Sequence, residues 1–252
     1  MVENHIFFDN PELNLDLVLQ KFLEGKLYAF HGTSEIYSKD IELKGFQRKW
    51  MPTNEATFLK LIKCLDQIGV PEILDNGHPS IRTRLNNYLL RRTSSPLSFT
   101  YTGYESLFYA TDLRKGGQIL MGIREAFDLI EGWHKENKKY LRLFLFKLSF
   151  IKLYYLLRRV KQKKGCIYIV EFEPEDLGML KHSQAVNAFG AFFCIQTSIE
   201  IISPRKIIGK IVIENNITVN TEIYMSAIVE TRNKMQRRGT LAFRLLENKL
   251  RS

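Results

Sequence analysis

The sequence changes in character near residue 165, where helical patterns give way to strand-forming runs. Three late runs are rich in β-branched and aromatic residues: CIYIVEFEP, AFFCIQTSIEII and KIIGKIVIE, which Pro174 and Pro204 separate. Two shorter strands are predicted earlier, at residues 27–33 and 96–101. Helices early and strands late predict an α+β fold with a mainly antiparallel core.

Apolar residues at helical spacing dominate the chain before residue 165. Residues 55–75, for example, place Phe58, Leu61, Ile62 and Leu65 on one helical face. The helices predicted in this way span residues 10–25, a short segment that ends at Gly45, residues 55–75, residues 104–133 with a break at Gly116 and Gly117, and a basic helix at about 226–252. We expect all of them to belong to one domain, over residues 1–252.

Several classes of protein are disfavoured by motifs that the sequence lacks. It contains neither GxGxxG nor GxxxxGK[ST], so a doubly wound dinucleotide fold and a P-loop are not expected. Its three cysteines, Cys64, Cys166 and Cys194, are far apart and form no CxxC pair. We therefore expect reduced thiols and no bound metal.

The chain is strongly basic, with a formal net charge of +10 and a pI near 9.4. Such a charge attracts polyanions without reading their sequence, so nucleic acid is a candidate partner. A solvated basic surface that binds no nucleic acid is the alternative. No signal-peptide pattern opens the sequence, and we expect a cytoplasmic protein.

Residues 140–164 have an unusual composition, because most of them are large and apolar while Arg142, Lys147 and Lys152 interrupt the run. Three cations in a segment of this length are costly at the centre of a bilayer, so stable membrane insertion is not expected. The segment fits a helix that packs against the domain, a helix at a membrane surface, or an element that binds a partner.

A His-Gly-Thr tripeptide, His31-Gly32-Thr33, ends the first predicted strand. The imidazole and the hydroxyl can contact a ligand, and a glycine lets the ligand approach the backbone. A structural histidine within a β-rich run is the alternative.

The order of motifs resembles the ADP-ribosyltransferase superfamily, in which a first core strand often carries HGT and holds the ribose of NAD. In that family a late strand bears a catalytic Glu, followed by a turn with Pro and an apolar strand. The segment QTSIEIISPRKIIGKIVIE is similar to this element, so the resemblance implies that Glu200 and His31 are catalytic. An exposed acid on an edge strand is the alternative reading of Glu200.

The family also has a middle motif, for which the sequence offers two candidates. LSFT is similar to the STS strand of the Arg-Ser-Glu branch and would supply Ser98. LFYATD is similar to the YFAD motif of the poly(ADP-ribose) polymerase branch and would supply Tyr109. The helical spacing around Tyr109 favours LSFT as the strand.

The resemblance covers three motifs within residues 27–213 and implies a split antiparallel β core with a helical N-terminal region. Residues 50–90 and 125–165 would then be helical insertions. The resemblance further implies NAD as a substrate, with Tyr28, His31, Gly32, Thr33, Ser98 and Tyr109 contacting it or supporting the catalytic Glu.

The acceptor of the ADP-ribose is suggested by residues near Glu200. Arginine-modifying relatives carry a second Glu at the position of Ser198, so arginine is disfavoured, whereas Gln196 and Ser198 are candidates for orienting another acceptor. The net charge favours nucleic acid, with RNA ahead of DNA. A protein side chain, RNA 2′-phosphotransferase chemistry and a non-catalytic basic binding module are the alternatives.

The small size and the apolar, basic segment at 140–164 resemble intracellular bacterial toxins of toxin-antitoxin and phage-defence systems. That resemblance implies two further partners, a cognate antitoxin and a chaperone, that cover residues 140–164.

Overall fold

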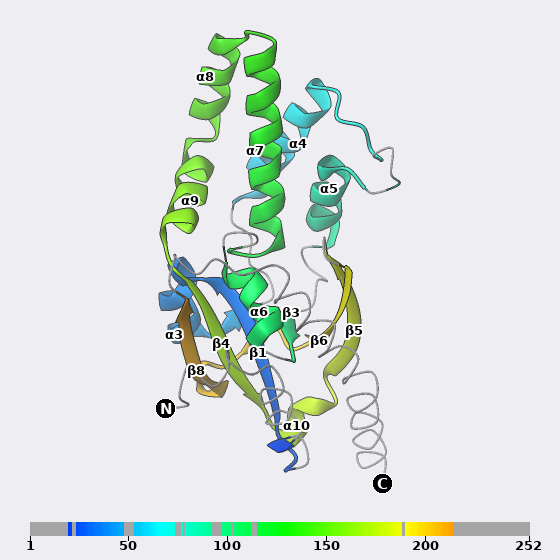
Figure 1. Ribbon diagram of the computed structural model, residues 1–252, viewed down its shortest axis with the longest axis vertical. Helices are drawn as coiled ribbons and strands as arrows, with labels where there is room; N and C mark the ends of the chain where they lie inside the picture. Colours follow the sequence, from blue (N-terminus) through cyan, green and yellow to red (C-terminus); the bar gives the residue numbers. More distant parts are fainter. Residues whose placement is uncertain are drawn as a thin grey trace.

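A computed structural model describes residues 20–21, 24–47, 53–73, 77, 79–91, 97–101, 103–111, 115–187 and 190–213. The predicted basic helix at 226–252 and most of the predicted helix at 10–25 lie outside these residues. The described part is α+β, with a six-stranded sheet and a group of helices at one end of it (Figure 1). Every strand pair is antiparallel, as predicted.

The large sheet has the strand order β5-β6-β3-β1-β4-β8. Its strands are β1 (Leu27–Ser34), β3 (Leu97–Thr100), β4 (Gly165–Phe172), β5 (Leu180–Asn187), β6 (Gly190–Thr197) and β8 (Ile207–Ile213). The predicted strands near residues 27, 97, 166 and 207 are confirmed, whereas β5 was not predicted.

The central strand β1 is joined very differently to its two neighbours. It pairs with β4 along its whole length, from Leu27 opposite Phe172 to Ser34 opposite Gly165. Its pairing with β3 is limited to one register position, Phe30 opposite Thr100. The two strands therefore diverge beyond this point, and the sheet is split between β1 and β3.

One face of the sheet is covered by helix α6 (Gly103–Ala110), which lies directly against the backbone of β1 and β4. A Cβ on Gly32 would lie 1.9 Å from the carbonyl oxygen of Ser106, and one on Gly165 would lie 1.6 Å from that of Ala110. Both glycines are therefore required for the close approach of α6.

The opposite face is covered by elements that follow β1 and precede β8. They are the 3-10 helix η1 (Glu35–Tyr37), helix α3 (Ser38–Lys44), the strands β2 (Phe46–Gln47) and β7 (Ile201–Ile202), and η2 (Pro204–Lys206). Strands β2 and β7 form a small antiparallel ribbon of their own. A short helix, α10 (Pro174–Leu177), follows β4.

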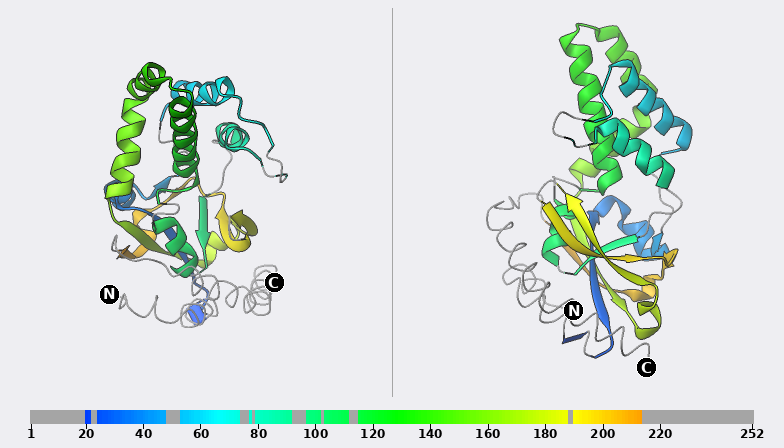
Figure 2. Two further views of the ribbon diagram at one scale, coloured as in Figure 1. Left: turned by 45° about the horizontal axis from the view of Figure 1, so that its top comes forward. Right: turned by 90° about the vertical axis from the view of Figure 1, so that its right-hand side faces the viewer.

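The remaining helices form a second hydrophobic core beyond one end of the sheet (Figure 2). They are α4 (Glu55–Gln67), α5 (Ile81–Arg91), α7 (Gln118–Glu136), α8 (Tyr140–Ser149) and α9 (Ile151–Gln162). On α4, Phe58, Leu61, Ile62 and Leu65 are buried, which confirms the predicted face. The helices within residues 50–90 and 125–165, which the resemblance implies are insertions, thus pack together in this core.

The segment 140–164 is two helices, because the backbone of Phe150 leaves helical geometry between α8 and α9. None of the helices in the described ranges combines the length and the apolar character that a membrane span needs.

Candidate functional site

His31 lies on β1 at the point where the sheet splits. Its Nδ1 is 3.0 Å from the carbonyl oxygen of Ser98 on β3. A carbonyl oxygen only accepts hydrogen bonds, so Nδ1 carries the proton and donates it. This side-chain bond joins β1 to β3 next to their single register position.

Aromatic side chains surround the imidazole of His31. The ring centroid of Phe46 on β2 lies 4.8 Å away in an edge-on arrangement, and that of Phe99 on β3 lies 5.4 Å away. Tyr168 on β4 is opposite His31 in the sheet, and its ring meets Phe46 edge-on. These contacts fix the plane of the imidazole.

The environment of His31 keeps the ring neutral near physiological pH. Burial lowers the pKa of His31 below its ordinary value, and the hydrogen bond to the Ser98 carbonyl opposes this only in part. In the neutral ring with a proton on Nδ1, Nε2 is a hydrogen-bond acceptor. His31 can therefore accept a hydrogen bond from a ligand hydroxyl.

The run AFFCIQTSIEII, predicted as one strand, is interrupted by a turn between β6 and β7, and the predicted Glu200 lies in this turn and not on a strand. The backbone N–H of Ile199 donates to Oγ1 of buried Thr197 at 3.1 Å, and the N–H of Ser198 donates to the carbonyl of Met179 at 3.2 Å. Glu200 follows in a bend and is exposed. These bonds thus hold the backbone at Ser198 and Ile199, just before Glu200.

The small β2–β7 ribbon connects the segment of Glu200 to His31. Ile202 on β7 pairs with Phe46 on β2, and Phe46 is the residue whose ring packs on the imidazole. Glu200 lies two residues before Ile202, and two extended residues span at most about 7 Å. The motifs of His31 and Glu200 are far apart in sequence, but both therefore lie beside the β2–β7 ribbon.

Ser98 and Gln196 are also brought together, because they are directly opposite each other on β3 and β6. The Ser98 carbonyl contacts His31, so the middle strand, the late strand and the histidine are linked through one residue. Ser198 contacts Met179 through its hydroxyl as well as its backbone.

Other predicted site residues lie elsewhere. Side chains alternate along β1, so Tyr28 and Gly32 are on the face opposite His31, and the Cβ of Tyr109 lies beside Gly32 on helix α6. Thr33 shares the face of His31 but is buried. LSFT is the strand and LFYATD belongs largely to a helix, as the helical spacing predicted.

The sequence reasoning missed the aromatic residues around His31. Phe99 and Tyr168 follow from strand alternation in LSFT and GCIYIVEF once the register is known, but no local signal in the sequence assigns Phe46 to the histidine. Phe46 lies on a two-residue strand, which is too short to show a period.

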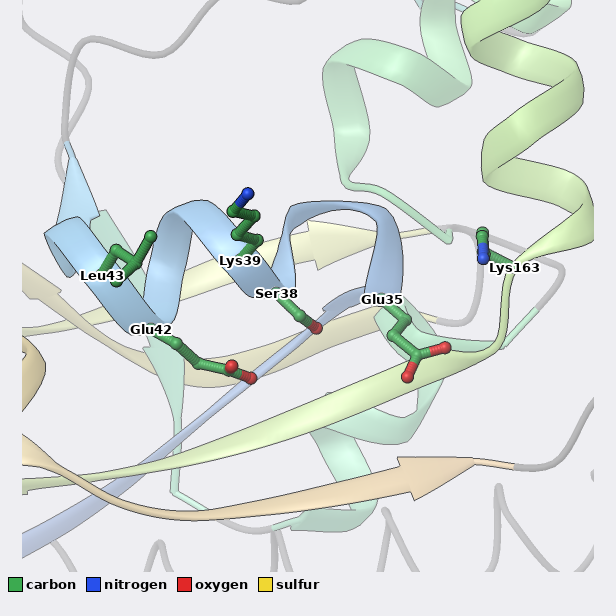
Figure 3. Close-up of a pocket in the computed structure, with 6 residues that line it drawn as sticks. All are labelled: Glu35, Ser38, Lys39, Glu42, Leu43 and Lys163. Carbon is green, nitrogen blue, oxygen red and sulfur yellow. The ribbon is translucent and has the colours of Figure 1, made fainter.

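A separate hollow of about 580 Å³ lies beside α3 (Figure 3). It is lined by Glu35, Ser38, Lys39, Glu42, Leu43 and Lys163. None of the predicted site residues lines this hollow. Glu42 connects this hollow to the sheet, because it accepts a hydrogen bond from Tyr168 at 3.1 Å and forms an ion pair with Lys210 at 2.9 Å. The contact with Lys210 lowers the pKa of Glu42.

The described residues were predicted to include no metal site and only reduced thiols, and two observations concern these groups. The described residues contain no group of three or more His, Cys, Asp or Glu side chains placed to hold a metal ion. Burial raises the pKa of the Cys166 thiol to about 11, so this thiol stays protonated at neutral pH.

Comparisons with family models, with curated proteins and with solved structures find no match for this chain.

Proposed function

We propose that the protein is an ADP-ribosyltransferase that uses NAD as the donor and His31 and Glu200 as its catalytic pair. One observation carries the proposal: Phe46 both packs on the His31 ring and pairs with Ile202, two residues after Glu200. The split between β1 and β3 at His31 adds support, because the resemblance implies a split antiparallel core and the imidazole at this position is half-buried.

The proposed reaction breaks the bond between C1′ of the ribose and the nicotinamide nitrogen. The bonding electrons leave with nicotinamide, and positive charge grows on the ribose in an oxocarbenium-like transition state, as in glycoside cleavage. The carboxylate of Glu200 would stabilise this charge near the 2′-hydroxyl. Nε2 of His31 would accept a hydrogen bond from a ribose hydroxyl and hold the sugar in place. An acceptor oxygen or nitrogen then bonds to C1′ and loses a proton.

The acceptor that we favour is nucleic acid, and RNA ahead of DNA. The chain carries ten more basic than acidic residues, since it has 37 Lys and Arg against 27 Asp and Glu. Ser198 stands where arginine-modifying enzymes resembling this chain have a second Glu, and it has no charge with which to activate a guanidinium.

The proposal is tested with NAD labelled on the adenylate phosphate, incubated with the protein and with RNA, DNA or cell lysate. We expect label on macromolecules that ribonuclease removes and protease does not. Removal by protease alone would assign a protein acceptor, and removal by deoxyribonuclease would assign DNA.

The matched pair of variants is Glu200→Gln and Glu175→Gln, because Glu175 is also exposed but lies on α10. We expect Glu200→Gln to lower NAD cleavage by at least about 100-fold, the scale of one lost charge-stabilising group. Glu175→Gln should retain wild-type activity. Full activity in Glu200→Gln would contradict the catalytic assignment of Glu200. Absence of NAD cleavage by the wild-type protein would instead favour a basic binding module.

A further inference from the structure

Helices α8 and α9 carry a concentration of exposed apolar side chains. Among the described residues, 17 large hydrophobic side chains are exposed, and eight of them lie between residues 140 and 155. Single exposed apolar residues are ordinary on protein surfaces, but a continuous group marks an interaction surface. The concentration on one helix pair therefore requires an explanation.

Six of these side chains lie on one side of the helix pair, and we call them the α8–α9 stripe. The stripe consists of Leu141, Phe144, Leu145, Leu148, Ile151 and Tyr155, which are 44–72% exposed. The opposite sides of the two helices are in the helical core, where Phe146 and Phe150 contact Phe127 of α7. The stripe thus lies on the side of the helix pair that faces away from α7. Figure 1 shows α7 beside α8 and α9.

The stripe has the sequence spacing of a coiled-coil seam. The bend at Phe150 leaves the two helices in phase, because the buried residues Leu143, Phe146, Phe150 and Leu153 keep intervals of three and four across it. Leu141, Leu148 and Tyr155 are seven residues apart, and Phe144 and Ile151 fall three residues after the first two. Apolar residues at alternating intervals of three and four are the positions that contact a second helix. The stripe is one helix wide and can be covered by one partner helix.

The charge around the stripe has one sign. Residues 137–164 contain ten Lys and Arg and no Asp or Glu. Lys147 pairs with Glu131 of α7 at 3.2 Å, whereas Arg142, Lys152 and Arg159 form no ion pair within the described part of the chain. A second copy of this chain would bring like charges together, which disfavours self-association.

Charge position distinguishes a partner helix from a membrane surface. Lys152 and Arg159 repeat the position of Leu145 at intervals of seven residues, so one edge of the stripe changes from apolar to cationic along its length. A flat apolar layer would have to accept these charges, at a cost in free energy. A helix with acidic residues at the facing positions would pair with them.

We propose that the α8–α9 stripe is the docking surface for an acidic amphipathic helix of a partner protein. This inference is independent of the proposed enzymatic activity. The partner helix covers the apolar stripe with its own apolar face, and its flanking Glu or Asp side chains neutralise Arg142, Lys152 and Arg159.

The test uses the full chain and two designed peptides of four heptads. Both have Leu at positions a and d, and they carry either Glu or Lys at e and g. Like charges discourage each peptide from pairing with itself. We expect the Glu peptide to bind at least about tenfold more tightly than the Lys peptide in a fluorescence anisotropy titration. Equal affinity, or no binding of the Glu peptide at about 100 μM, would overturn the proposal. So would binding to vesicles of phosphatidylglycerol and phosphatidylcholine without binding of the Glu peptide.

Two sets of variants locate the binding surface. Leu148→Glu should weaken binding of the Glu peptide at least about tenfold, whereas Leu90→Glu on α5, an equal change at an exposed leucine, should leave it within about twofold. A double variant, Lys152→Glu with Arg159→Glu, should reverse the preference between the peptides. Because these are exposed side chains, all variants should keep the wild-type melting temperature. Loss of binding in Leu90→Glu, or an unchanged preference in the double variant, would contradict the proposal.

Discussion

His31 has two roles at the split of the sheet, and each role uses a different atom of its imidazole ring. Nδ1 joins β1 to β3 through the Ser98 carbonyl, so this atom supports the fold. Nε2 faces the opposite way across the imidazole and is the atom assigned to the ligand. Replacing the ring thus removes a structural bond and a proposed ligand contact together, and activity assays of His31 variants need a parallel measurement of stability.

The lowered pKa of His31 makes stability depend on pH with a defined sign. The unfolded chain takes up a proton near pH 6.5, the ordinary value for histidine, while the folded chain does so only at lower pH. The stability is therefore complete above about pH 6.5 and falls as the pH drops below this value. We expect the free energy of unfolding, measured in urea, to decrease between pH 7.5 and pH 5.5.

A His31→Gln variant isolates this contribution. It lacks the titrating ring but keeps His134, whose pKa burial also lowers. Its free energy of unfolding should be lower at pH 7.5 and should change less between the two pH values. An equal pH dependence in the variant and the wild type would show that His31 does not titrate differently on folding.

Two glycines provide a matched test of the packing between β1 and α6. In Gly32→Ala the new Cβ would overlap the Ser106 carbonyl, whereas nothing lies within 4 Å of a Cβ at Gly132 in α7. We expect Gly32→Ala to destabilise the protein by about 2 kcal/mol or more. Gly132→Ala should stabilise it by about 0.5–1 kcal/mol, because alanine favours a helix. Thermal unfolding of both variants measures the difference, and a neutral Gly32→Ala would be inconsistent with the contact.

At the scale of elements, Lys115 joins the start of the α7 region to the end of α9. Its ammonium group donates to the carbonyl of Lys163 at 2.8 Å and lies 3.4 Å from that of Lys161, just where α9 leaves its last carbonyls without helical partners. The side chain is buried. Lys115 therefore caps α9 from outside its own helix.

We expect Lys115→Met to destabilise the protein by about 1–3 kcal/mol, because it removes the buried charged donor from carbonyls at the end of α9. Lys161→Met, which removes an exposed cation from α9 itself, should change stability by less than about 0.5 kcal/mol. Urea unfolding distinguishes the two. Equal effects would mean that general charge, not the cap, determines the stability of α9.

The sequence predicted those elements whose signals are local. The apolar face of α4, the end of α3 at Gly45, the break at Gly116 and Gly117, and the strand at Ser98 all follow from spacing or turn residues within a few positions. Strand β5 was missed because LKHSQAVN alternates weakly and lies at the sheet edge. The bend at Phe150 was missed because no Gly or Pro marks it.

At the scale of the whole molecule, the sequence supplied candidate site residues but not their arrangement. Motif order indicated His31 and Glu200, yet their connection runs through Phe46, whose role depends on a ribbon between residues distant in the chain. Gly32 was expected to admit a ligand. The structure gives it another role, because the space beside it is filled by α6. Such contacts depend on tertiary packing and produce no periodic pattern in the sequence.

The central strand β1 pairs with strands that are distant in sequence, and this affects how the chain folds during translation. β1 is synthesised before both of its partners, which come from residues 97–100 and 165–172, and β8 completes the sheet at residues 207–213. Both edges of β1 therefore stay unpaired while the intervening helices are synthesised and assemble. Contacts so distant in sequence slow folding and prolong the exposure of apolar strands. The helical core is built mainly from segments that are close in sequence, so it can form first. The late strands then join the sheet beside this core.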